Sequence, residues 1–178
     1  MTGARNTSLI AAVGRGLDLA SRVLDLAAQI AGLSMIAVLT ATLFGTVVIR
    51  YLGLFTQSFA WVDETSRFLF IWMSFLGATV VSRRASHIRI GFAVDGLPER
   101  VRTVITIAVE AGVIFFLAVL LAQGWFVTRQ TWVQTSPSLG LPMSYVYVSL
   151  PVSAALMLVH AARAIFMRRR EEQWDPHS

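Results

Sequence analysis

Asp63, Glu64 and Arg67 are the charged residues whose types and spacing could do chemistry in this chain. On a helix, residues three or four positions apart lie on one face, so either carboxylate could pair with the guanidinium group. The charge-free stretch that follows, 68–82, has only 15 residues. A helix that crosses a membrane needs roughly 20 residues. A membrane span here must therefore begin near Phe59, which places all three charges within its first two turns.

Two interpretations of these three charges remain open. Charged groups inside a membrane are usually functional, which suggests an ion site or a contact with a partner subunit. The simpler interpretation is a local ion pair at the water-facing end of a helix, with Trp61 as an interface anchor. In both cases Arg67 lies about 12 Å along the helix from Phe59. We expect it to face protein, because facing lipid at that depth is costly.

A second group of candidates lies in later apolar stretches. Glu110 is about 10 Å into its stretch when counted from Thr103. His160 and Arg163 occur at a similar depth of the last stretch. A carboxylate at this depth could couple transport to protons. We favour the alternative, in which Glu110 takes part in an interhelical pair within this chain.

The residues that enzymes and cofactor sites need are missing from the sequence. There are no cysteines, which excludes thiolate metal sites, thiol nucleophiles and disulfides. The three histidines, at 87, 160 and 177, do not form the stacked pairs on facing helices that would bind haem. No nucleophile elbow, phosphate loop or HExxH pattern occurs. We therefore expect no catalytic residues, no cofactor, no metal and no enzyme activity.

The composition indicates that membrane helices position these residues. The chain has 178 residues, 56% of them hydrophobic and 14% charged, and its mean hydropathy is +0.66. A soluble domain of this size could not bury so much apolar surface, so we expect an all-α integral membrane protein with a single domain. Four transmembrane helices are predicted, over 26–49, 59–82, 104–128 and 143–162.

The arginines determine the expected orientation. All fifteen cationic residues are Arg, and twelve of them lie in the N-terminal segment, the loop after the second span or the tail 163–178. The positive-inside rule therefore places both termini in the cytoplasm. The loop after the second span includes an expected interfacial connector over 87–97, and Arg129 is expected in the loop after the third span. Because the net charge of +5 follows from arginines that flank spans, we expect no nucleic-acid partner.

A charged helix face precedes the first span. Within 8–25 the charges Arg15, Asp18, Arg22 and Asp25 recur at intervals of three and four residues and share one side of a helix. We predict an N-terminal amphipathic helix that lies on the cytoplasmic membrane surface with this face in water. The alternative is that the segment simply extends the first span into the cytoplasm.

Several runs of residues resemble a known family. They are Val48-Ile49-Arg50-Tyr51, Trp61 to Trp72, Gly77-Ala78, His87-Ile88, Leu139 to Met143 and Tyr147 to Val152. In this order and spacing they are similar to the small membrane subunit, of the DctQ type, of tripartite ATP-independent periplasmic (TRAP) transporters. The resemblance covers about residues 25–165. Thr65 and Ser144 depart from the family pattern, in which an aliphatic and an aromatic residue are usual.

The resemblance implies a system of three parts in a bacterial inner membrane. A periplasmic binding protein captures an organic acid, and a large permease subunit moves it with the energy of an ion gradient. The small subunit binds and stabilises the large one as a non-catalytic scaffold, in contact with membrane lipids. The candidates for subunit-interface or structural residues are Arg50, Trp61, Asp63, Glu64, Arg67, Trp72, His87, Glu110 and His160.

Two rival hypotheses belong to other functional classes. The first is a self-sufficient small proton-coupled exporter that uses Glu110, but this residue is expected nearer the cytoplasmic side than the middle of the membrane. The second is a four-helix membrane enzyme or redox protein, which the missing cysteines and haem ligands disfavour. A neighbouring gene for a large permease would favour the scaffold over both.

Overall fold

The computed structural model describes residues 2–53, 60–85 and 98–173. Within these ranges the chain is helical, apart from chain ends and a turn segment that contains one isolated β-bridge between Thr135 and Pro142. The elements are α1 (Thr2–Tyr51), α2 (Ala60–Ala85), α4 (Glu99–Gln130), the 3₁₀ turn η1 (Thr131–Val133), α5 (Ser144–Tyr147) and α6 (Ser149–Gln173).

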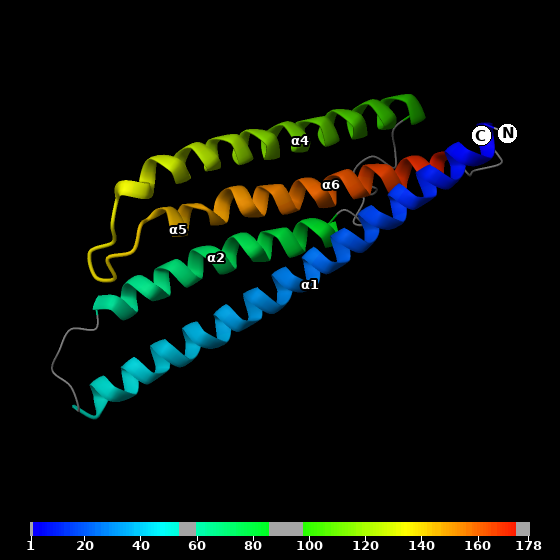
Figure 1. Ribbon diagram of the computed structural model, residues 1–178. Coiled ribbons are helices and arrows are strands. Elements are labelled where there is room, and N and C mark those ends of the chain that lie inside the picture. The colour runs from blue at the N-terminus through cyan, green and yellow to red at the C-terminus, as the bar shows by residue number, and fades with distance from the viewer. Residues whose placement is uncertain (1, 54–59, 86–97, 174–178) are drawn as a thin grey trace.

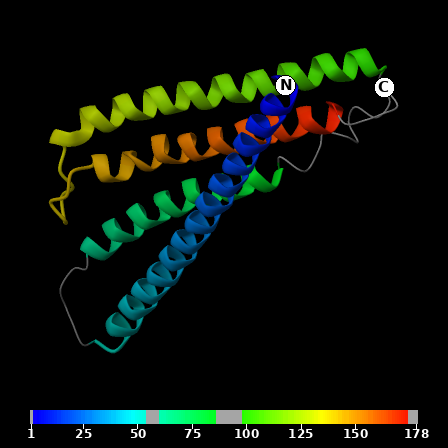
Figure 2. The ribbon, with the colours of Figure 1, turned by 45° about the vertical axis from the view of Figure 1, so that its right-hand side comes forward.

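The long helices form an open layer. Figure 1 shows α4, α6 and α2 side by side, with α1 at the opposite edge from α4. The central helix α6 packs on α1, α2 and α4, and α1 packs chiefly on α2. Successive long helices run in opposite directions, so the start of α1 and the end of α6 lie at the same end of the layer (Figure 1 and Figure 2).

Four helical segments in the described part of the chain are long and apolar enough to cross a membrane, in agreement with the four predicted spans. The last of them contains α5 and α6, which are separated only at Val148. Pro151 explains this interruption, because it lacks the N–H that would bond to the carbonyl of Tyr147. The four segments are Gly14–Tyr51, Ala60–Arg84, Arg100–Val133 and Ser144–Met167.

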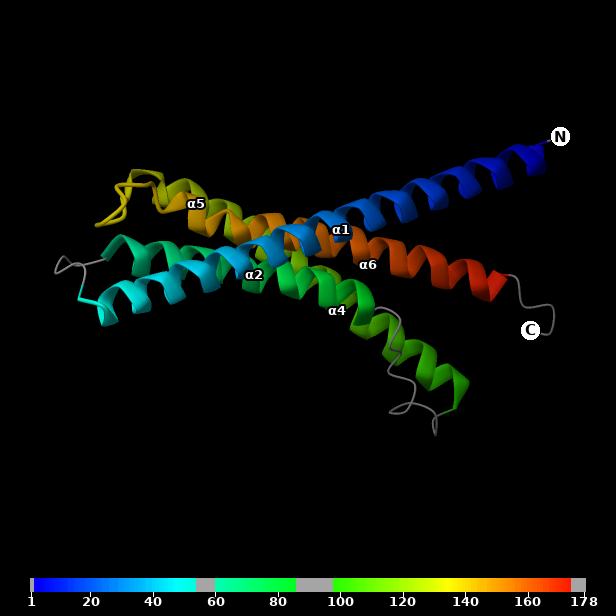
Figure 3. The same ribbon diagram turned by 90° about the horizontal axis from the view of Figure 1, so that it is seen from below.

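The first helix is longer than the expected span. α1 has 50 residues, which corresponds to about 75 Å of length. A membrane hydrocarbon core is only roughly 30 Å thick. The structure has no break between 8–25 and 26–49, so the two segments form one continuous helix, as the alternative of an extended first span expects, and a location of 8–25 on the membrane surface stays a prediction (Figure 3). The physical reason is that no proline in this stretch removes a backbone hydrogen bond.

Hydroxyl side chains along the helices find acceptors within their own helix. A hydroxyl that faces lipid without such a bond costs several kcal/mol, of the order of 4. Back-bonding therefore lets these residues lie in apolar surroundings. Thr42, Thr46, Thr65, Ser74, Thr79, Thr106 and Thr128 each donate to the carbonyl four residues earlier.

Few apolar side chains are buried within the described chain itself. Large apolar residues such as Leu33, Phe44 and Phe115 are exposed on the outer faces. Such surfaces suit contact with lipid or with another apolar helix, not with water. The buried apolar residues are Ala28, Val62, Leu76, Leu117, Val146 and Ala154.

Helices α4 and α6 approach each other closely at Gly124. A Cβ added there would lie 3.0 Å from Pro151 Cδ and 3.1 Å from Pro151 N. These atoms belong to a rigid ring and to the backbone, so neither can rotate away. Small residues commonly allow membrane helices to pack this closely, and Gly124 does so here.

Replacement of this glycine tests the packing. Gly124→Ala should lower the melting temperature of the purified chain, because overpacking typically costs about 1–3 kcal/mol. Gly112→Ala in the same helix is the matched control, since a Cβ there meets nothing within 4 Å. The control should leave the melting temperature unchanged or raise it, because alanine favours a helix over glycine. Equal melting temperatures for the two variants would contradict the close contact.

Candidate functional site

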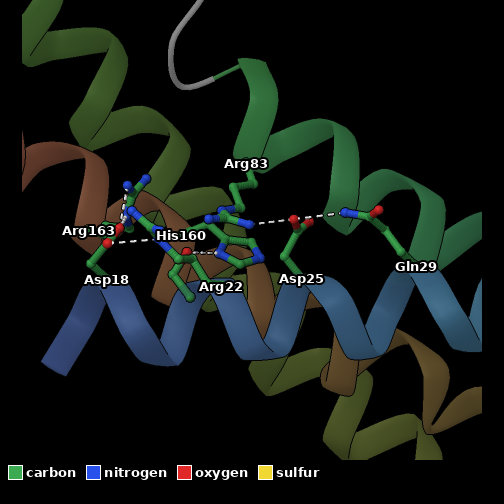
Figure 4. A network of polar contacts seen from close by, with 8 residues as sticks. Asp18, Arg22, Asp25, Gln29, Arg83, His160 and Arg163 are labelled. Carbon is green, nitrogen blue, oxygen red and sulfur yellow. Dashed lines mark hydrogen bonds and ion pairs between the residues drawn. The ribbon is translucent and has the colours of Figure 1, made fainter. Parts of the chain in front are cut away.

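A cluster of polar side chains joins α1, α2 and α6 near the end of the layer where α1 begins (Figure 4). Asp18 of α1 accepts a 2.6 Å hydrogen bond from Arg163 Nε of α6. The same carboxylate lies 2.9 Å from Arg22 Nε, one turn further along α1. Because Arg163 is largely buried and Arg22 is exposed, the interhelical pair contributes more to stability than the pair within α1.

A second carboxylate of α1, Asp25, joins α1 to α2. Its Oδ2 atom accepts hydrogen bonds from Arg83 of α2 and, over 2.8 Å, from Gln29 Nε2 one turn along α1. Asp25 is only 7% exposed. A buried carboxylate needs a close cation, since desolvation would otherwise favour its neutral form. Arg83 supplies that cation from a position 58 residues away in the sequence.

His160 of α6 lies within the same cluster. Its Nδ1 atom shares a 2.9 Å hydrogen bond with the hydroxyl of Ser21, and the histidine is 1% exposed. Its Nε2 atom and the Oδ1 atom of Asp25 are buried without a hydrogen-bond partner among the described residues. His160 therefore makes an interhelical contact, and its partner is Ser21 of α1.

The cluster corrects the interpretation of the charged face within 8–25. The sequence pattern grouped Asp18, Arg22 and Asp25 correctly on one side of a helix, but we assigned that side to water. In the structure Asp18 and Asp25 face α6 and α2, while Leu19 and Val23 on the other side are exposed. The physical reason is that each carboxylate gains a cationic partner by facing inward, which offsets its desolvation.

The opposite end of the layer contains a different polar contact, made by Glu64. Its Oε2 atom accepts backbone hydrogen bonds from Ser138 over 2.9 Å and from Leu139 over 3.0 Å. These two residues lie in the turn between η1 and α5. The turn is closed by a 2.8 Å bond from Ser136 N to Leu141 O and by Gly140, whose φ of +64° favours glycine. Glu64 therefore fixes this turn to the first turns of α2.

Trp72 makes a further contact between α2 and the same region. Its indole Nε1 donates a 2.8 Å hydrogen bond to the backbone carbonyl of Tyr145 in α5. The hydrogen bonds of Glu64 hold α2 to the turn, and the hydrogen bond of Trp72, about two helical turns further along α2, holds it to α5. Both residues are structural candidates in the sequence, but their hydrogen-bond partners lie too far along the chain for local spacing to identify them.

The other charges near the start of α2 are not paired as the spacing suggested. Glu64 bonds to the turn, and among the described residues neither Asp63 nor Glu64 pairs with Arg67, so the local ion pair, one of the two interpretations left open, is not observed. In the described part of the chain Arg67 makes no hydrogen bond or ion pair and is exposed. Trp61, in the first turn of α2, is half exposed.

The remaining candidates have separate positions. Arg50 is exposed in the last turn of α1, and Glu110 is half-buried on α4. His87 lies outside the described residues. Arg129 is in the last turn of α4 and not in a loop, with its Cζ 5.4 Å from the centroid of the Trp125 ring. In the described ranges, no group of three or more His, Cys, Asp or Glu residues could hold a metal ion.

The pair between Asp25 and Arg83 should dominate the stability of the polar cluster. Asp25→Ala leaves the guanidinium of Arg83 without its partner and should cost about 3 kcal/mol, seen as a lower melting temperature of the purified chain. Asp63→Ala is the control, because Asp63 is exposed and unpaired within the described residues. It should change stability by less than about 0.5 kcal/mol.

A double variant separates the pair from the packing around it. Asp25→Leu with Arg83→Leu removes both charges and should recover most of the stability that Asp25→Ala loses. If Asp25→Ala melted at the temperature of Asp63→Ala, the pair would carry no stability.

Comparison with known proteins places the chain in a family. The isethionate TRAP transporter permease protein DctMQ of Oleidesulfovibrio alaskensis is 35% identical over 131 residues, which make up 70% of this chain and 20% of that protein. The chain thus spans about a fifth of that relative's length. The sialic acid TRAP transporter small permease protein SiaQ of Vibrio cholerae is 25% identical over 150 residues, 84% of this chain and 86% of that protein.

A third relative and a family pattern agree with these two. The C4-dicarboxylate TRAP transporter small permease protein DctQ of Rhodobacter capsulatus is 30% identical over 120 residues, 66% of this chain and 52% of that protein. The pattern of the DctQ component of tripartite ATP-independent periplasmic transporters matches residues 39–171. This match includes residues 39–51 of α1, all of α2, α4 and α5, and most of α6. The chain is a multi-pass membrane protein of the family of DctQ components of tripartite ATP-independent periplasmic transporters.

Proposed function

We propose that this chain is the small permease subunit of a TRAP transporter in a bacterial inner membrane. It acts as a non-catalytic scaffold that binds and stabilises the large permease subunit. The large subunit moves an organic acid, which a periplasmic binding protein delivers, with the energy of an ion gradient. The observation that carries the proposal is the family match over residues 39–171, which covers the end of α1, all of α2, α4 and α5, and most of α6.

The DctMQ relative supports the partnership with a large permease. The shared region makes up 20% of that permease protein, so there a DctQ-like segment is joined to a much longer chain. Two segments of one polypeptide are held at a high effective concentration, which suits parts that must remain together. The same partnership here requires a surface on this region that binds the large permease.

The open layer offers such a surface. Because the helices lie in a layer, large apolar side chains of α1 and α4 remain exposed along most of their length. The charged residues Asp18, Asp25, Arg83 and Arg163 are occupied with one another and hold the layer together. An arrangement of this kind provides a fixed support for a moving partner, and it supports the scaffold over an exporter that depends on Glu110.

Arg67 is the residue that we propose to contact the large subunit. It is exposed two turns into α2, and Glu64 of the same helix is already bonded to the turn at 138–139. The five donors of a guanidinium group need acceptors, and an unpaired arginine at this depth of a membrane is costly. Acceptors from the large subunit would satisfy these donors and orient α2 against it.

Assembly with the large subunit tests this role. Arg67→Ala should reduce the amount of large permease that co-purifies with the chain by about tenfold, the loss expected for a charge-assisted hydrogen bond in an apolar setting. Arg84→Ala is the matched control, because Arg84 is also exposed on α2 but lies in its last turn. Equal recovery of the large permease with both variants would remove Arg67 from the interface. Gradient-driven uptake by the purified chain alone would overturn the scaffold itself.

We also propose that both termini are cytoplasmic, so the turn that Glu64 holds is periplasmic. The chain has no cysteine, so a single introduced thiol reports one position. A membrane-impermeant thiol reagent should label Ser138→Cys in cells whose inner membrane is intact. Ser86→Cys and Ser178→Cys should be labelled only after the membrane is opened. Labelling of Ser178→Cys before opening would contradict this orientation.

A further inference from the structure

The polar cluster contains two buried atoms whose hydrogen bonding is incomplete, Nε2 of His160 on α6 and Oδ1 of Asp25 on α1. The two residues are 1% and 7% exposed, respectively. No hydrogen bond joins the two atoms directly, and neither has another partner within the described residues. Buried polar atoms without a partner are costly and rare in folded proteins, so two of them in one cluster need an explanation.

The hydrogen bond between Ser21 and His160 determines which ring nitrogen carries a proton. The hydroxyl of Ser21 is fully buried, and its 2.9 Å bond to Nδ1 is the only one that it makes among the described residues. The hydroxyl has one proton to donate, and Nδ1 is the acceptor within its reach. Nδ1 is then unprotonated, and the proton of the neutral imidazole is on Nε2. The atom of His160 that lacks a partner is therefore a donor.

The unpartnered acceptor is close to this donor. In Figure 4 His160 and Asp25 are neighbours, and Arg83 reaches the same carboxylate from α2. Asp25 is also near enough to act electrostatically on His160. Its Oδ2 atom accepts from Arg83 and Gln29, so Oδ1 is the oxygen that remains. A donor of α6 and an acceptor of α1 thus lie near each other without a direct hydrogen bond.

The enclosure of the two atoms determines what kind of molecule could join them. Neither atom is accessible from outside the chain, so a lipid headgroup or a solute cannot reach them. A metal ion does not fit, because no group of three His, Cys, Asp or Glu residues converges in the described ranges and the arginines of the cluster repel cations. A water molecule is small enough to be enclosed when the helices pack, and it can both accept and donate hydrogen bonds.

We propose that a buried water molecule bridges His160 and Asp25, accepting a hydrogen bond from Nε2–H and donating one to Oδ1. Arg83 can supply a further bond, because a guanidinium has five N–H donors and the bond to Oδ2 uses one of them. Buried waters typically make about three hydrogen bonds to groups that otherwise lack partners. The bridge completes a chain of hydrogen bonds from Ser21 through His160 and the water to Asp25, which joins α1 to α6 beside α2.

Solid-state NMR of the full chain in lipid bilayers, with isotope-labelled histidine, tests the proposal. The chain has three histidines, at 87, 160 and 177, and the signals that disappear in His160→Gln identify those of His160. We expect the nitrogen shifts of a protonated Nε2 and an unprotonated Nδ1. We also expect a cross peak between the Nε2 proton and water, at a mixing time too short for exchange with bulk water.

Removal of the acceptor should remove the bridging water. In Asp25→Leu with Arg83→Leu the cross peak to water should be lost, whereas the Nδ1 shift, which reports the bond to Ser21, should remain. Asp63→Ala is the control, because Asp63 lies in the first turn of α2 at the other end of the layer, and it should keep the cross peak. The melting temperature of each variant shows that it is folded before its spectrum is compared.

Three results would overturn the proposal. A protonated Nδ1 with an unprotonated Nε2 would leave no donor for the water at Nε2. The absence of a water cross peak in the unmodified chain, together with a close contact from the Nε2 proton to the carboxyl carbon of Asp25, would show that the two side chains bond directly. Persistence of the cross peak in the double variant would show that the water does not depend on Asp25.

Discussion

Apolar helices in a bilayer gain little by leaving lipid for one another, because lipid tails are as apolar as the side chains that they replace. The helices of this chain are therefore held by specific polar contacts and close packing. At one end of the layer, Asp18 and Asp25 bind Arg163 and Arg83 across helices. At the other end, Glu64 binds the backbone of the turn before α5. Between these ends, Gly124 lets α4 rest against Pro151 of α6.

The magnitudes explain why these few contacts are sufficient. A surface ion pair contributes about 0–1 kcal/mol, whereas breaking a buried pair by removing one partner costs about 3–5 kcal/mol. Asp25 is 7% exposed and His160 is 1% exposed. The ion pairs of the polar cluster are therefore compared with buried pairs and not with surface pairs. The cost of desolvating the carboxylates is offset by the arginines that face them, which makes the relative positions of α1, α2 and α6 specific.

The arginines have different roles at different positions of the fold. Arg83 and Arg163 are enclosed by helices and pair with carboxylates of α1, so they hold the layer together. Arg67 and Arg129 are exposed at the opposite end and have no carboxylate partner among the described residues. Their donors are available to molecules outside the chain, and for Arg67 we propose the large permease subunit. A layer that is stabilised internally at both ends can bind such partners without rearrangement.

The sequence by itself determined the membrane class, the four apolar helices and the placement of Asp63, Glu64 and Arg67 in the first turns of α2, because these follow from composition and from the length that a span requires. It also placed Asp18, Arg22 and Asp25 on one side of a helix, because their spacing matches the helical period. The tertiary structure decided which way that side faces. Local spacing within α1 contains no information on Arg83 and Arg163, which lie 58 and 145 residues from their carboxylate partners. Only when the helices pack do these cations approach, and the balance between desolvation and pairing then turns the charged side of α1 inward.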